Sequence, residues 1–193
     1  MKCLYCDKTI NRFSLISTIE KDCLCVDCRK GMRMKRRISY YGDLEVMTVY
    51  EYESLFKSIL LQYKECYDEA LKDVFLYCLE DYLKFRYRGY HIVYVPSSKH
   101  KKEERGFEHL RLIFERLKFK EVKGLVMKTE LIQEGKNTEE RLKMKSNYSY
   151  EGDYHEKILI VDDVVTTGSS LLGVYSALRP YSREIKAFVL ARV

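Results

Sequence analysis

A short segment near the C-terminal end of the chain combines two adjacent carboxylates with a hydroxyl-rich turn around a glycine. The four apolar residues 158–161 predict a buried strand, Asp162 and Asp163 follow it, and a helical pattern covers residues 171–178. Backbone N–H groups at the start of a helix bind anions, and Gly168 lets the backbone approach a ligand closely. Carboxylates accept hydrogen bonds from sugar hydroxyls. The segment therefore indicates a sugar-phosphate site, with an ordinary strand–loop–helix turn as the alternative.

The N-terminal cysteines have the spacing of a metal site. Two Cys-x-x-Cys pairs, separated by eighteen residues, are formed by Cys3, Cys6, Cys25 and Cys28. Two such pairs direct four thiolates at one tetrahedral centre, which predicts a structural Zn²⁺ site with no open position for catalysis. A segment of about 35 residues cannot bury a sufficient core alone, so a metal would stabilise it. Disulfides are the alternative, and they suit a chain without an export signal poorly.

The other cysteines and the histidines show no metal or catalytic-triad spacing. Cys23 is predicted to be a spectator beside the zinc site, although it could exchange with a ligand. Cys66 and Cys78 lie among apolar residues at helical spacing and are predicted to be core positions. Surface or core roles are expected for His91, His100, His109 and His155.

Apolar periodicity predicts alternating strands and helices after the cysteine-rich segment. Strands are expected at residues 38–41, 44–50, 92–95, 124–127, 158–161 and 185–190. Helices are expected between residues 52 and 85 with a break around 65–68, and at 105–117 and 169–178. Residues 128–156 are polar and have no sustained period. This order predicts an α/β fold with a parallel sheet, divided into a zinc module at 1–37 and a main domain at 38–193.

Length and charge limit the possible classes of function. The chain has 193 residues and a net charge of +6, which permits an anionic partner without requiring one. No apolar run has the length of a membrane span, and the N-terminus, Met1-Lys2-Cys3, lacks the apolar region of an export signal, so a cytoplasmic protein is expected. No Gly-x-x-x-x-Gly-Lys-Ser/Thr sequence occurs, which excludes a P-loop nucleotide hydrolase.

Residues 29–37 carry six positive charges and no acid. Two interpretations are open: a solvated linker, or a surface that contacts the phosphate backbone of nucleic acid. Tyr40 and Tyr41 could add aromatic stacking, as in proteins that bind single-stranded DNA. The candidate nucleic-acid contacts are Arg33, Lys35, Arg36 and Arg37.

Residues 158–170 resemble the phosphoribosyl-pyrophosphate (PRPP) signature of type I phosphoribosyltransferases at all thirteen positions. The resemblance implies that Asp162 and Asp163 hold the ribose hydroxyls and that residues 166–170 surround the 5-phosphate, with Mg²⁺ bound alongside PRPP. The implied PRPP-binding residues are Val164, Val165, Thr166, Thr167, Gly168, Ser169 and Ser170. In this class the loop after an earlier strand holds the pyrophosphate, and here that loop contains Pro96, Ser97, Ser98 and Lys99.

A polar loop at residues 128–147 has the length of a functional lid. Phosphoribosyltransferases use such a loop to exclude water, and its cations could neutralise pyrophosphate. A solvated loop without that role is the alternative. The cations in question are Lys136, Arg141, Lys143 and Lys145.

The whole chain resembles the ComF/ComFC family of competence-associated proteins, which have a zinc ribbon before a phosphoribosyltransferase-like domain. The features that carry the resemblance are the paired cysteines, the PRPP segment, Tyr63-Lys64, Arg105-Gly106-Phe107 and the Gln133…Arg141 loop. The sequence departs from the family pattern where Glu108 and Met144 replace asparagine. The family implies a role in natural transformation, with single-stranded DNA and a competence helicase of the ComFA type as partners. An active phosphoribosyltransferase with a nucleobase or another small acceptor is the alternative.

Overall fold

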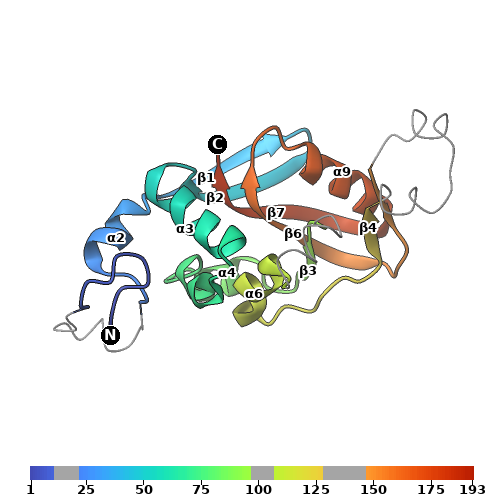
Figure 1. Cartoon of the computed structure of the whole chain (residues 1–193). Helices are drawn as coiled ribbons and strands as arrows, with labels where there is room; N and C mark the ends of the chain where they lie inside the picture. Colours follow the sequence, from blue (N-terminus) through green and yellow to red (C-terminus); the bar gives the residue numbers. More distant parts are fainter. Residues whose placement is uncertain (11–21, 97–106, 128–146) are drawn as a thin grey trace, which may run out of the picture.

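A five-stranded sheet forms the centre of the molecule (Figure 1). The computed structural model describes residues 1–10, 22–96, 107–127 and 147–193. The strands are β1 (Met34–Tyr41), β2 (Leu44–Glu51), β3 (His91–Tyr94), β6 (His155–Val165) and β7 (Ser182–Arg192). Their order in the sheet is β1-β2-β7-β6-β3. All are parallel except β1, which pairs antiparallel with β2 at one edge, so the predicted α/β class is confirmed.

Helices cover both faces of the sheet (Figure 1). One face packs against α3 (Ser54–Glu65), η1 (Glu69–Val74), α4 (Glu80–Arg86), α6 (His109–Phe114) and η2 (Glu115–Leu117). The other face packs against α9 (Ser169–Leu178), η3 (Arg179–Tyr181) and a two-stranded sheet of β4 (Leu125–Met127) and β5 (Tyr148–Tyr150). Because the central strands are buried on both sides, they are continuously apolar, as the run at 158–161 illustrates.

The predicted hairpin between residues 38 and 50 is confirmed. Gly42 occupies the turn between β1 and β2 with a φ of +58°, a left-handed conformation that favours glycine. Strand β1 begins earlier than predicted, at Met34, because its pairing with β2 extends back to Tyr50. The helix α2 (Val26–Gly31) ends shortly before it. Residues 29–31 therefore belong to α2 and residues 34–37 to β1, so the segment is not a linker, although most of its basic side chains are exposed as the solvated interpretation predicts.

The break predicted in the helical region is confirmed, because α3 ends at Glu65. The chain then continues through the 3₁₀ helix η1 to the short helix α4. In the predicted helix at 105–117, Arg105 and Gly106 lie outside the described residues, and α6 with η2 occupies His109–Leu117. Strand β5 was not predicted, because a strand of three residues leaves almost no periodic signal.

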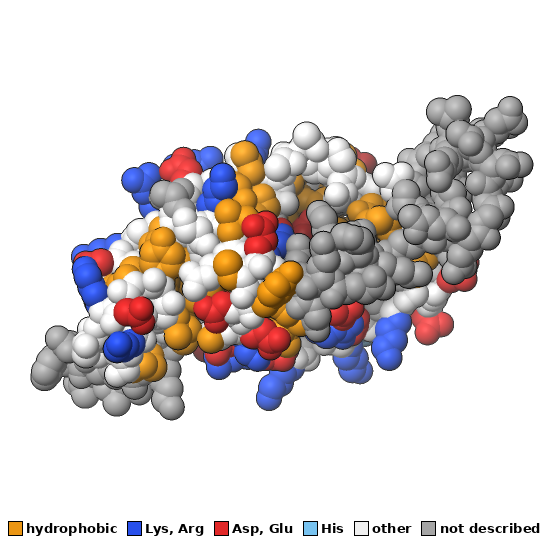
Figure 2. Space-filling view, viewed as in Figure 1, with side chains coloured by type: hydrophobic (Ala, Val, Ile, Leu, Met, Phe, Trp, Pro, Cys, Tyr) orange, Lys and Arg blue, Asp and Glu red, His pale blue; other side chains and the backbone are white. Residues whose placement is uncertain are grey.

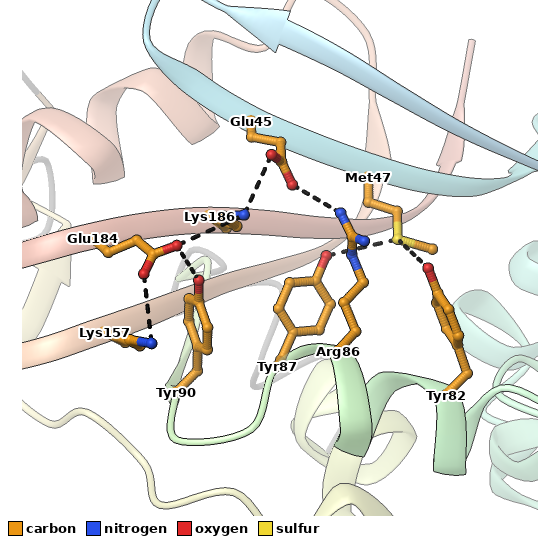
Figure 3. Close-up of polar contacts among 9 residues, drawn as sticks. All are labelled: Glu45, Met47, Tyr82, Arg86, Tyr87, Tyr90, Lys157, Glu184 and Lys186. Atoms are coloured by element: carbon orange, nitrogen blue, oxygen red, sulfur yellow. Dashed lines mark hydrogen bonds and ion pairs between the residues drawn. The ribbon is translucent and has the colours of Figure 1, made fainter.

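A network of charged and tyrosine side chains joins α4 and the following turn to three strands (Figure 3). Glu45 of β2 accepts a hydrogen bond from Arg86 at 3.0 Å and lies 3.3 Å from Lys186 of β7. Tyr90 donates to Glu184, which also pairs with Lys157. The strand residues of this network lie in the amino-terminal halves of β2, β6 and β7. The network therefore attaches the helical layer to that end of the sheet, and the carboxyl ends of the strands are left for a ligand.

Candidate functional site

The acidic pair lies on strand β6 itself. The sequence predicts a strand over residues 158–161, but β6 continues to Val165, which still pairs with Arg192 of β7. Successive side chains of a strand point to opposite faces of the sheet, so Asp162 and Asp163 face different sides. Asp162 faces the side covered by α9 and β5, and Asp163 faces the helices α3 and α6.

Asp163 is held by two basic side chains from the helical layer. Its Oδ2 atom accepts a hydrogen bond from Lys64 Nζ of α3 at 2.7 Å and lies 2.6 Å from His109 Nε2 of α6. The side chains of His109 and Asp163 are 7% and 10% exposed, and that of Lys64 is 20% exposed. This is a buried, charge-assisted cluster.

The pKa values of the two carboxyl groups are shifted in opposite directions. Although burial opposes it, the hydrogen bond from His109 and the charge of Lys64 hold the pKa of Asp163 well below its usual value. Burial and the neighbouring charge of Asp163 raise the pKa of Asp162 well above its usual value. Compared with isolated carboxyl groups, the ionised form is therefore favoured in Asp163 and the neutral form is favoured in Asp162.

The turn between β6 and α9 forms a small hollow of about 50 Å³. Gly168 has a φ of +77°, and any Cβ at this position would meet the ring of Tyr41. Thr167 Oγ1 lies 2.8 Å from Ser169 Oγ, and both hydroxyls are exposed. The lining consists of the predicted PRPP residues Val164, Val165, Thr166, Thr167, Gly168, Ser169 and Ser170, with Asp162 and Leu171. Asp163 is not among the described residues that line it.

A larger cavity of about 470 Å³ adjoins the carboxyl end of β3. Pro96, the one described residue of the predicted pyrophosphate loop, lines it together with His109; Ser97, Ser98 and Lys99 lie outside the described residues. Arg111 on its wall stacks on the ring of Tyr94 at 5.2 Å and donates to Glu121. The predicted lid cations Lys136, Arg141, Lys143 and Lys145 also lie outside the described residues.

The four paired cysteines come together as predicted. The sulfur atoms of Cys3, Cys6, Cys25 and Cys28 all lie within 4.8 Å of one another, and those of Cys6 and Cys25 are 3.7 Å apart. A tetrahedral zinc ion with Zn–S distances of about 2.3 Å requires sulfur–sulfur distances of roughly 3.8 Å. The donor set and its dimensions therefore fit a structural zinc ion.

The environment of Cys3 favours a thiolate. Burial opposes ionisation, but hydrogen bonds from the backbone of Cys25, Cys6 and Tyr5 lower the pKa of Cys3 to about 7. Cys23 is half-buried and outside the cluster, consistent with a spectator. The core positions predicted for Cys66 and Cys78 are wrong, because both residues are exposed. Cys66 directly follows α3, and Cys78 lies in the turn before α4. The helical period does not continue through these two positions, so their apolar neighbours face the core and the two cysteines do not.

The cysteine cluster is joined to the helical layer of the main domain through Arg29. This guanidinium pairs with Asp22 at 2.6 Å, donates to the carbonyl of Val74 at 2.9 Å and lies over the ring of Tyr77. Leu24 and Met32, which flank α2, belong to the same buried core as α3. Arg29 is therefore a docking residue, whereas the predicted nucleic-acid residues of β1 and the preceding turn are exposed.

Sequence reasoning missed two members of the acidic cluster. His109 is treated as an ordinary core or surface residue, and Lys64 enters only as part of a family resemblance. A signal for Lys64 exists, since it is a basic residue in the last turn of a helix that carries a strong apolar stripe. For His109 no local signal distinguishes it, because its partner lies 54 residues away.

Comparison with known proteins supports the resemblance seen in the motifs. No family model matches the chain. The chain is 28% identical to "Competence protein ComFC" of Streptococcus pneumoniae (strain ATCC BAA-255 / R6), in a 221-residue alignment that covers 100% of both proteins. Among the described residues, no helix is both long and apolar enough to cross a membrane. The full-length similarity, with the cysteine cluster in place, supports the assignment of the chain to the ComFC family of competence proteins.

Proposed function

We propose that this chain is a competence-associated protein that binds PRPP with Mg²⁺ at the turn between β6 and α9. The observation that carries the proposal is the turn itself: Gly168 in a left-handed conformation, exposed hydroxyls on Thr167 and Ser169, and the N-terminus of α9 directly behind them. Exposed hydroxyls and the N–H groups at a helix N-terminus are suitable donors to a phosphate.

Asp162 is the residue of the acidic pair that a ligand in this hollow would meet. It lines the hollow and is partly exposed, and it lies next to the charged Asp163, so a cation beside it would reduce the repulsion between the two carboxylates. Mg²⁺ commonly uses one or two carboxylates together with substrate phosphates. The donor set therefore suits Mg²⁺ held between Asp162 and the ribose hydroxyls or phosphates, where it would neutralise phosphate charge.

Titration calorimetry with PRPP and Mg²⁺ tests the proposal. We expect Asp162→Asn to weaken binding at least about tenfold, because a charge-assisted hydrogen bond contributes roughly 1.5–3 kcal/mol. Asp153→Asn is the matched control, since Asp153 is an exposed acid on the segment before β6 and should leave the affinity unchanged. Equal affinities in the wild type and in Asp162→Asn would rule out this placement of the sugar.

The competence role includes a proposed contact with single-stranded DNA through β1. Three predicted contacts are paired with acids: Arg33 pairs with Glu53, and Lys35 and Arg37 share Glu51, so two negative charges offset part of the three positive ones. Figure 2 accordingly shows basic and acidic side chains interspersed on the visible face. Arg36, which stacks over Tyr82, and Tyr40, which is 69% exposed, are the better candidates for backbone contact and base stacking.

Fluorescence anisotropy with a labelled oligonucleotide across a salt series tests this contact. We expect the affinity to fall as the salt concentration rises. A plot of the logarithm of the association constant against the logarithm of the salt concentration should have a slope of about −0.7 for each phosphate contacted. The slope should become shallower when the four basic residues are neutralised together in Arg33→Gln, Lys35→Gln, Arg36→Gln and Arg37→Gln. A control variant carries Lys118→Gln and Lys120→Gln. Both lysines are exposed and are far from β1 in the sequence, so this variant should keep the wild-type slope. Affinity that is insensitive to salt would count against a DNA surface here.

An active phosphoribosyltransferase is the alternative use of the same site. The 470 Å³ cavity beside the acidic pair has the volume of a small-molecule site, which favours an acceptor or leaving group there. Steady release of pyrophosphate from PRPP in the presence of a free purine or pyrimidine would support turnover. Binding without release under the same conditions would favour a PRPP-binding competence protein.

A further inference from the structure

The small hollow and the large cavity lie on the two sides of the acidic pair. Asp162 lines the hollow at the turn before α9, and His109 lines the cavity at the end of β3. Asp163 connects them, because it is adjacent to Asp162 in β6 and lies 2.6 Å from His109 Nε2. The contact between Asp163 and His109 therefore links a neighbour of the hollow to the wall of the cavity.

Asp163 is poorly placed to be a ribose ligand. Its Oδ2 atom already interacts with both Lys64 and His109, and it is not among the described residues that line the hollow. A buried carboxylate that accepts from two bases fixes the orientation of both, as second-shell carboxylates do for histidines elsewhere. The geometry therefore gives Asp163 a positioning role.

His109 is suited to an anionic ligand group in the cavity. The contact between Asp163 and Nε2 fixes the orientation of the imidazole, and His109 lies on the cavity wall. Arg111, on the same wall, pairs with Glu108 and Glu121, so its position too is fixed by carboxylates. Lys123 adds a positive charge from the opposite segment. Phosphate oxygens accept hydrogen bonds from such donors.

We propose that His109, held by Asp163 and Lys64, contacts the pyrophosphate end of PRPP, and that Asp163 acts as a positioning residue rather than a ribose ligand. The inference rests on the proposed function, because it requires that PRPP binds with its 5-phosphate at the turn before α9. It assigns the two carboxylates different tasks: Asp162 meets the sugar or its Mg²⁺, and Asp163 fixes the imidazole.

Comparing PRPP with ribose 5-phosphate, which lacks the pyrophosphate, separates these tasks. Calorimetry with Mg²⁺ should show that His109→Gln and Asp163→Asn each weaken PRPP about tenfold or more. The same two variants should leave the affinity for ribose 5-phosphate within about twofold of the wild type. Asp162→Asn should weaken both ligands, and the control His155→Gln, at the far end of β6, should weaken neither. Circular dichroism at the assay temperature verifies that each variant is folded.

Two results would overturn the inference while leaving the proposed function intact. One is an Asp163→Asn variant that loses both ligands to the same extent as Asp162→Asn, because this is the behaviour of a ribose ligand. The other is unchanged PRPP affinity in His109→Gln. A wild-type protein that binds neither ligand would instead remove the proposed function itself, and the inference with it.

Discussion

Replacing Cys28 with serine is expected to release the bound zinc and to unfold the N-terminal module while the central sheet survives. Structural zinc sites contribute on the order of 10–16 kcal/mol to folding, far more than the few apolar residues of this segment can supply. Zinc content should fall from about one ion per chain to almost none. Hydrogen exchange should show lost protection at Cys3 and Leu4, whose amides bond to Lys8 and Cys23, with retained protection in β6 and β7.

Cys66→Ser is the matched control for the zinc prediction. Cys66 is also a cysteine, but it is exposed and outside the cluster, so its replacement should change neither zinc content nor exchange. Removing zinc from the wild type with a strong chelator should reproduce the exchange pattern of Cys28→Ser. A wild-type protein that contains no zinc when purified and keeps its Cys3 and Leu4 amides protected would contradict a structural metal site.

Replacing Asp163 with asparagine is expected to cost roughly 3 kcal/mol of stability at neutral pH, because it leaves Lys64 and His109 buried against a neutral group. The pKa of Asp163 is lower in the folded protein than its ordinary value of 3.8. Its ionisation therefore adds stability at pH values above about 4, and this contribution is lost as the pH falls below that value. The effect of the substitution should accordingly shrink in acid.

This pH dependence can be measured only in a variant in which Asp162 no longer titrates. The raised pKa of Asp162 has the opposite sign: its contribution is present below pH 4 and is lost as the pH rises. Urea unfolding should therefore compare Asp162→Asn with the double variant Asp162→Asn/Asp163→Asn at pH 7 and at pH 3. The two should differ by roughly 3 kcal/mol at pH 7 and by about 1 kcal/mol less at pH 3, because the contribution is lost gradually between the ordinary pKa of 3.8 and the lower pKa in the folded protein. A difference that is the same at both pH values would show that the Asp163 charge does not stabilise the fold.

The parts of the fold that sequence could predict have local signals. The run at 158–161 is continuously apolar because β6 is covered on both faces, and Gly42 marks a hairpin turn through its own backbone preference. The metal site could also be predicted from the cysteine pairs, because Cys-x-x-Cys spacing reflects the geometry of a single turn. The end of β6 was misjudged, since acids such as Asp162 and Asp163 are usually depleted in strands and here are retained within one.

The electrostatics of the site could not be predicted, because they depend on contacts between distant parts of the chain. Lys64 lies 99 residues from Asp163 in sequence, and His109 lies 54 residues from it. Neighbouring positions in the sequence make Asp162 and Asp163 look equivalent. Only the alternation of β6 and the packing of α3 and α6 on one face give the two carboxylates opposite shifts in pKa.

A crystal structure of the protein soaked with Mg²⁺ and PRPP tests the central claim most directly. The account predicts that the 5-phosphate lies against Thr167, Gly168 and Ser169, with the ribose beside Asp162. Density for PRPP elsewhere on the protein, or an empty turn at saturating ligand in a lattice that leaves it open, would contradict the account.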